Sequence, residues 1–137
     1  MRARYVLTAR ATVDLREARA WSRARWGKEL TSRYFDDLHE GAQFIAENQS
    51  ALRGRQELSG GSSLLVYPVR EHYIVYEPLA ERFIAVVAVI RQGRDIPGIL
   101  QKWSVPIRRE LVEIRAKIAR GEIASPTRSA ARPHRKK

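Results

Sequence analysis

The segment that most constrains the fold of this chain is an apolar, largely β-branched run over residues 83–90. A run of this length without polar alternation predicts a buried strand in the middle of a sheet. It stops abruptly at Arg91-Gln92-Gly93-Arg94-Asp95, so two arginines are expected at the C-terminal edge of the strand. Cations at such an edge suit either a phosphate contact or a protein contact. The following residues, 96–100, predict a turn into a short docking segment.

Two amphipathic helices are expected before the sheet. Residues 4–8 predict a short first strand, with Thr8 as the N-cap of the next helix. Small and apolar side chains follow at helical spacing on one side of that helix, and arginines occupy its other side. Gly27 ends it, and a second helix is expected over residues 28–48. Two such helices joined by a short break predict an antiparallel helical hairpin, and its remaining apolar surface needs a sheet to cover it. The apolar stripe of the first helix is Ala11, Leu15, Ala18, Ser22 and Trp26, and that of the second is Leu30, Tyr34, Leu38, Ala42 and Ile45.

The remaining strands follow a polar, glycine-rich connection over residues 48–63. Strands are expected over 64–69, 72–76 and 83–90, with a turn over 77–82. Pro68 has no N–H to donate, which places it at a bulge or on an edge strand. The order β-α-α-β-β-β predicts an α+β fold, an antiparallel sheet with the helical hairpin packed on one face.

A further element lies beyond this core. After Pro106, apolar residues recur at helical spacing up to Gly121, which predicts an amphipathic C-terminal helix. Residues 122–137 are rich in Pro, Ser and basic side chains without any apolar period, which predicts a disordered tail. The expected organisation is a core domain over 1–104, the helix over 105–121 and the basic tail over 122–137. The apolar stripe of the helix is Ile107, Leu111, Ile114 and Ile118.

Composition limits the possible partners and chemistry of the chain. The formal net charge is +11 for 137 residues, which favours an acidic partner, either nucleic acid or an acidic protein segment. Without cysteine there is neither a disulfide scaffold nor a thiolate metal site, and we expect no metal and no cofactor. The chain has no apolar run long enough to span a membrane and no apolar core of a signal peptide near Met1, so we expect a cytoplasmic protein without a membrane partner.

Four stretches together resemble one known family, the ParE branch of the RelE/ParE toxins of type II toxin–antitoxin modules. The resemblance covers roughly residues 4–102. The stretches are Leu7-Thr8 with Ala11 and Asp14-Leu15, the break at Trp26-Gly27, the pattern Tyr67-Pro68-Val69-Arg70-Glu71-His72-Tyr73-Ile74-Val75-Tyr76, and Ile90-Arg91-Gln92-Gly93-Arg94-Asp95-Ile96-Pro97.

This resemblance implies one of two activities. RelE-like members cut ribosome-bound mRNA, which requires cations and proton carriers beside the phosphate. ParE-like members inhibit DNA gyrase by protein–protein contact without covalent chemistry. Here no tyrosine follows Tyr76, the only later histidine is His134, and Gln92 stands where relatives often have histidine. Arginine holds its proton too tightly to act as the carrier. We therefore expect contact rather than cleavage, and no catalytic residue.

The candidate contact residues fall into two groups. Candidates for contact with the target are Arg70, His72, Arg91 and Arg94, and candidates for antitoxin binding are Trp21, Trp26, Tyr34, Leu38, Ile45 and Val89. Each group also has a purely structural interpretation. His72 can satisfy a local hydrogen bond, and Arg70 can pair with Glu71, Glu77 or Asp95. Arg91 and Arg94 can form a solvated strand end, and the tryptophans can be core or hairpin-lid aromatics.

The resemblance also implies the partners. The expected partner is a ParD-like antitoxin with a ribbon-helix-helix domain and a flexible C-terminal arm, which forms a hetero-oligomer with the toxin, and the expected target is DNA gyrase. Two alternatives stay open: a ribosome-dependent mRNA endonuclease, and a repurposed binding module whose basic tail has non-specific affinity for nucleic acid.

Because no packing period occurs in the tail, deletion of residues 122–137 is expected to leave antitoxin affinity unchanged. Calorimetric titration of the full-length and truncated chains with the cognate antitoxin measures this. A large loss of affinity on truncation would show that the tail takes part in the complex.

Overall fold

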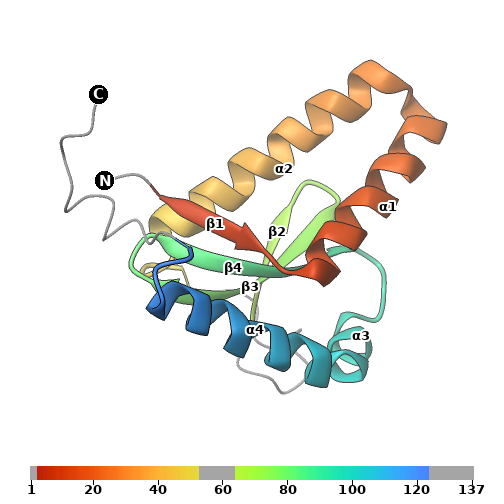
Figure 1. The fold of residues 1–137 in the computed structure, drawn as a ribbon. Helices are drawn as coiled ribbons and strands as arrows, with labels where there is room; N and C mark the ends of the chain where they lie inside the picture. Colours follow the sequence, from red (N-terminus) through yellow and green to blue (C-terminus); the bar gives the residue numbers. More distant parts are fainter. Residues whose placement is uncertain (1–2, 53–63, 124–137) are drawn as a thin grey trace, which may run out of the picture.

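The computed structural model describes residues 3–52 and 64–123, and it confirms the expected α+β class and the order of the core elements (Figure 1). The expected tail, from residue 124 on, and the connection over 53–63 lie outside the described residues. The elements are β1 (Arg4–Leu7), α1 (Ala9–Trp26), α2 (Lys28–Asn48), β2 (Leu65–Val69), β3 (His72–Ala80), β4 (Phe83–Arg91), α3 (Ile96–Lys102) and α4 (Ser104–Ala119).

The four strands form one sheet in the order β1-β4-β3-β2. Strands β2, β3 and β4 are antiparallel neighbours, as expected, but β1 runs parallel to β4, with Arg4 opposite Phe83 and Leu7 opposite Val86. The sheet is therefore mixed rather than wholly antiparallel. Strand β4 is buried from residue 83 to residue 90, so both of its edges need a neighbour. A four-residue strand such as β1 carries no pattern that reveals its direction.

Helices cover both faces of the sheet and make three layers (Figure 1). Residues of β4 alternate between the two faces from Ile84 to Val87, and a register shift against β3 then puts Val87 and Ala88 on the same face. Ile84 and Val86 pack in one cluster with Ala42 and Ile45 of the hairpin. On the other face a second cluster joins the sheet to α3 and α4, and its members from these elements include Ala85, Val87, Leu100, Ile107 and Leu111. The hairpin thus covers one face, as expected, and the C-terminal helix docks on the opposite face.

Local signals set most element boundaries. The Thr8 hydroxyl accepts a hydrogen bond from the Ala11 N–H at 3.1 Å, which confirms its role as N-cap. Gly27 separates α1 from α2 with a φ of 89°, a conformation that strains residues with a Cβ. Pro68 lies in β2, which is an edge strand, as its missing donor requires. The expected turn over 77–82 is shorter, because β3 continues to Ala80.

The segment after β4 folds back onto the domain. The docking segment expected over residues 96–100 forms the first part of the short helix α3, which continues to Lys102, and α4 begins slightly earlier than Pro106. The Glu110 carboxylate of α4 accepts a hydrogen bond from the Ala9 N–H of α1 at 2.6 Å. Arg115 donates to Glu77 at 2.7 Å and to the Pro78 carbonyl at 3.1 Å. Helix α4 is thus fastened to both α1 and β3. Of the helices that the structure describes, none is long and apolar enough to cross a bilayer.

Replacement of Leu111 by alanine is expected to lower the free energy of unfolding by about 2–5 kcal/mol, because it opens a cavity between α4 and the sheet. The neighbouring Val112 is 65% exposed, and Val112→Ala is the matched control, with an expected change within about 0.5 kcal/mol. Urea denaturation of the full chain measures both. Equal effects of the two substitutions would contradict the docking of α4 on the sheet.

Candidate recognition site at the end of strand β4

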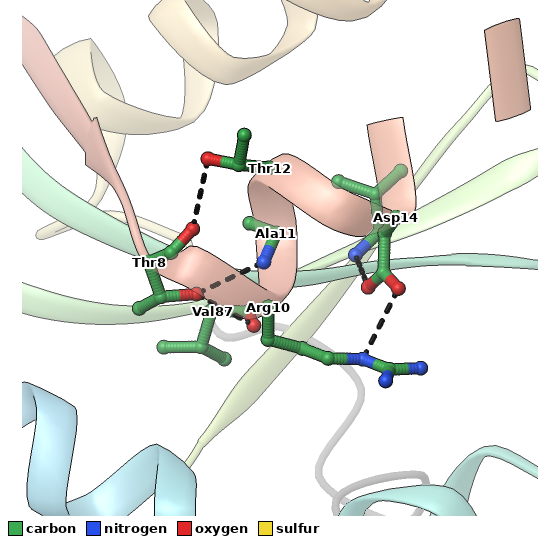
Figure 2. A network of polar contacts seen from close by, with 7 residues as sticks. Thr8, Arg10, Ala11, Thr12, Asp14 and Val87 are labelled. Carbon is green, nitrogen blue, oxygen red and sulfur yellow. Dashed lines mark hydrogen bonds and ion pairs between the residues drawn. The ribbon is translucent and has the colours of Figure 1, made fainter. Parts of the chain in front are cut away.

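Side chains at the start of α1 bind the backbone of the last part of β4, where the pairing with β1 has ended. Strand β1 pairs with β4 only as far as Val86. Beyond that point, the buried Thr8 hydroxyl donates to the Val87 carbonyl at 3.0 Å, and the Asp14 carboxylate accepts a hydrogen bond from the Val89 N–H at 3.0 Å (Figure 2). Helix α1 therefore crosses β4 at a fixed place.

Asp14 is a buried carboxylate with two partners. The Arg10 Nε lies 3.1 Å from the second carboxylate oxygen of Asp14 (Figure 2). The Asp14 side chain is 6% exposed. Burial raises the pKa of Asp14 above its ordinary value of 3.8, while the Val89 N–H and the Arg10 charge oppose that rise. The guanidinium of Arg10 also lies 4.5 Å from the centre of the Trp103 ring. The Asp14–Arg10 pair is thus held between β4 and the segment that joins α3 to α4.

A cavity of about 260 Å³, here named the β4-end cavity, lies beside this pair. Helix α1 lines it with Arg10, Asp14, Glu17, Ala18 and Trp21. The strands and the segment after them line it with His72, Val89, Ile90, Arg91, Arg94 and Ile99. The cavity brings together three candidates for target contact, His72, Arg91 and Arg94. It also contains two candidates for antitoxin contact, Trp21 and Val89.

The two arginines at the end of β4 carry the free positive charge of this cavity. Both side chains are exposed, and among the described residues no carboxylate lies within ion-pair distance of either. The guanidinium of Arg91 lies 4.5 Å from the centre of the Trp21 ring. Gly93 has a φ of 96°, and in the turn around it the Arg94 N–H donates to the Arg91 carbonyl at 3.3 Å. This tight turn keeps the two arginines close together.

His72 is buried and already has a partner. Its Nδ1 lies 2.6 Å from the Tyr34 hydroxyl, and that hydroxyl accepts the Glu71 N–H at 3.0 Å. The Tyr34 proton is then left to donate to Nδ1, which puts the proton of the neutral ring on Nε2. Burial lowers the pKa of His72 below 6.5, and the positive charge of Arg91 lowers it further. The local hydrogen bond expected for His72 is confirmed.

Arg70, the remaining candidate for target contact, does not line the β4-end cavity. It pairs with Asp37 at 2.5 Å, and its guanidinium lies 5.1 Å from the centre of the Tyr34 ring. The expected pairing with Glu71, Glu77 or Asp95 is therefore wrong. The correct partner lies on α2, far away in the sequence, so the spacing around Arg70 could not reveal it. Gln92 is also structural, because its side chain donates to the Arg70 carbonyl at 2.8 Å.

The candidates for antitoxin contact differ in the surface that they offer. Ile45 is fully buried in the hairpin-side core and has no surface for a partner. Trp26 is half-buried between Trp21, at 5.5 Å, and Tyr34, at 5.3 Å, measured between ring centres. This cluster is the lid of aromatic side chains expected near the hairpin break.

A second cavity, of about 340 Å³, lies where α1, α2 and the sheet meet. Leu15 of α1, Phe35 and Leu38 of α2, and Val86 of β4 form part of its wall. Val89 of β4 lines both cavities. Helix α1 also contributes to both, with Trp21 in the β4-end cavity and Leu15 in the second one. We name this second space the hairpin cavity.

Four residues of the β4-end cavity were not predicted as site residues from the sequence: Arg10, Asp14, Glu17 and Ile99. Asp14 carried a usable signal, because it lies three residues after Ala11 on the buried side of α1. A carboxylate in such a stripe indicates a buried polar partner. Arg10 lies among the arginines of α1, and its contacts with Asp14 and Trp103 explain its place in the site.

These features define a class, the RelE/ParE-like α+β toxins, in which a helical hairpin packs on a sheet whose last strand ends in arginines. Residues 5–96 match the family described as the ParE toxin of the type II toxin–antitoxin system parDE. The chain belongs to this family, and it is the toxin component of such a module, whose partner is an antitoxin. The match ends where α3 begins, so α3 and α4 lie almost wholly outside it.

Two known proteins illustrate the similarity. The Toxin ParE of Escherichia coli is 29% identical over 92 residues, which are 67% of this chain and 87% of that protein. A solved structure titled as the chromosomal ParDE TA system from P. aeruginosa has a TM-score of 0.56 at 14% identity, and the match covers 65% of this chain and 95% of the other. The structural likeness concerns the fold alone.

The titration of His72 tests the geometry of the β4-end cavity. Arg91→Gln is expected to raise the pKa of His72 toward 6.5, because a nearby cation is removed, whereas Arg108→Gln on α4 leaves it unchanged. The folded state favours the neutral ring, so stability is lost as the pH falls through 6.5 toward the lowered pKa. NMR titration of the imidazole signals measures the pKa of His72 in the wild type and in both variants. An unchanged pKa in Arg91→Gln would contradict the closeness of the two side chains.

Proposed function

We propose that this toxin inhibits DNA gyrase by binding, without chemistry of its own. We also propose that its antitoxin is ParD-like, with a ribbon-helix-helix domain and a flexible C-terminal arm. Membership of the ParE family supports the target. The arrangement of charges at the end of β4 supports the absence of catalysis.

One observation carries the proposal: the β4-end cavity holds free cations beside a histidine that is already engaged. Cleavage of RNA needs groups that accept and donate protons near the phosphate. His72 is buried, and its Nδ1 already contacts the Tyr34 hydroxyl. Asp14 is fully occupied by Val89 and Arg10. Arginine is a poor proton carrier, so Arg91 and Arg94 contribute positive charge rather than proton transfer. This set of groups suits recognition of an acidic surface.

The hairpin cavity suits the arm of the antitoxin. Its lining combines apolar side chains with the polar side chains of Arg19, Asp36 and His39. A flexible arm that folds on binding can place apolar side chains into such a hollow and wrap a large surface. Leu38 and Val89 are the expected contacts there, and Trp21 and Trp26 extend the contact toward the hairpin break.

Expression of the toxin without its antitoxin tests the proposal. The unopposed wild-type chain is expected to arrest growth, to leave transcripts intact and to accumulate cleaved DNA–gyrase complexes. The double variant Arg91→Ala/Arg94→Ala is expected to form about tenfold fewer of these complexes, because charged contacts with the target are lost. Arg108→Ala/Arg109→Ala, which removes equal charge from the exposed face of α4, is the matched control and stays toxic.

Two other results would each select an alternative function. Transcripts cut within codons, with no gyrase complexes, would identify an mRNA endonuclease. Full viability, with the folded chain present at normal levels, would indicate a repurposed binding module.

A further inference from the structure

We propose that the β4-end cavity is a carboxylate-binding pocket, which takes one acidic side chain from an extended acidic segment of a protein partner. Arg91 and Arg94 would hold the carboxylate, and apolar walls would hold the adjoining methylene groups. This inference rests on the proposed function in one respect: the partner is a protein rather than RNA.

The two arginines are prepared for an anion. Their charges are exposed and unpaired among the described residues, and the turn at Gly93 keeps them adjacent. The contact of Arg91 with the Trp21 ring holds its guanidinium in place before any ligand arrives. A guanidinium fixed in this way loses less conformational entropy when it binds, and it matches the two oxygens of a carboxylate.

The size of the cavity favours one side chain over a nucleotide. Its volume of about 260 Å³ lies below the roughly 300–1,000 Å³ of pockets that enclose small-molecule ligands. Ala18, Ile90 and Ile99 give it apolar walls. An acidic side chain with its methylene stem fits such a mixed space.

The aromatic lining of the cavity also disfavours a nucleic acid. Asp14 and Glu17 line the cavity beside Arg91 and Arg94, and their negative charge acts on an acidic peptide and on a nucleic acid alike, so the aromatic lining distinguishes the two ligands. Recognition of a single-stranded nucleic acid further needs a free aromatic face for the bases. Trp21 already contacts the guanidiniums of Arg91 at 4.5 Å and Arg25 at 4.8 Å. A carboxylate needs no free aromatic face.

Binding of two polyanions to the full-length chain tests the pocket. The probes are a capped hexaglutamate peptide and an oligothymidylate with the same number of charges, with a capped hexaglutamine peptide as the neutral control. The arginine Nε–H signals in NMR spectra of the labelled protein report the site, and calorimetry at fixed ionic strength gives the affinity. Hexaglutamate is expected to shift the Arg91 and Arg94 signals and to bind more tightly than the oligothymidylate, and hexaglutamine is expected not to bind.

Matched variants separate the pocket from general charge. Arg91→Gln/Arg94→Gln is expected to weaken hexaglutamate binding about tenfold, which corresponds to about 1.4 kcal/mol. Arg108→Gln/Arg109→Gln removes the same charge outside the cavity and is expected to change the affinity less than about twofold. Equal losses in the two variants, or tighter binding of the oligothymidylate through Arg91 and Arg94, would overturn the proposal. Neither gyrase nor antitoxin is present, so a failure of gyrase inhibition leaves this result unaffected.

Discussion

The hydrogen bond from the Val89 N–H to the Asp14 carboxylate is the contact on which the rest of the site depends. Strand β1 ends opposite Val86, and a buried strand cannot leave the following backbone groups without partners. Thr8 and Asp14 supply these partners from α1. The same contacts fix the path of α1 across the sheet, and that path separates the β4-end cavity from the hairpin cavity. One requirement for backbone hydrogen bonds thus creates both candidate binding surfaces.

A buried carboxylate is itself costly and needs support. Arg10 pairs with Asp14, and Trp103 covers Arg10 from the other side. Glu110 of α4 accepts the first N–H of α1, where the helix dipole favours a negative charge. Two of these supports, Trp103 and Glu110, come from residues beyond the region matched by the ParE family. In this chain the C-terminal helices therefore stabilise the wall of the cavity as well as cover the sheet.

The sequence predicted the elements whose signals are local. The apolar run at residues 83–90 predicted β4, Thr8 predicted the start of α1, and Gly27 predicted the break in the hairpin. Features that depend on distant residues were missed. The direction of β1 depends on its neighbour, the partner of Arg70 lies on α2, and α3 is too short to show a period. In the site, the position of Arg91 and Arg94 was predicted because the strand end placed them. Arg10 and Asp14 were not, since beyond their own pairing they contact Trp103 and Val89, which are distant in the sequence.

The division of charges around this strand end supports the proposed role in recognition. Positive charge stays free on Arg91 and Arg94, whereas His72 and Asp14, two of the groups able to move protons, are buried and hydrogen-bonded. The proposed carboxylate pocket depends on the same residues, because the cavity wall that contains Asp14 also limits the size and the charge of a ligand.

Amide hydrogen exchange at Val89 tests the central claim most directly, by comparison of the wild type with Asp14→Asn and Asp14→Ala. The asparagine retains an acceptor oxygen, so its Val89 amide is expected to exchange nearly as slowly as that of the wild type. The alanine variant is expected to exchange at least about tenfold faster at Val89, while amides between β3 and β4 stay protected. Unchanged protection at Val89 in the alanine variant would contradict the account.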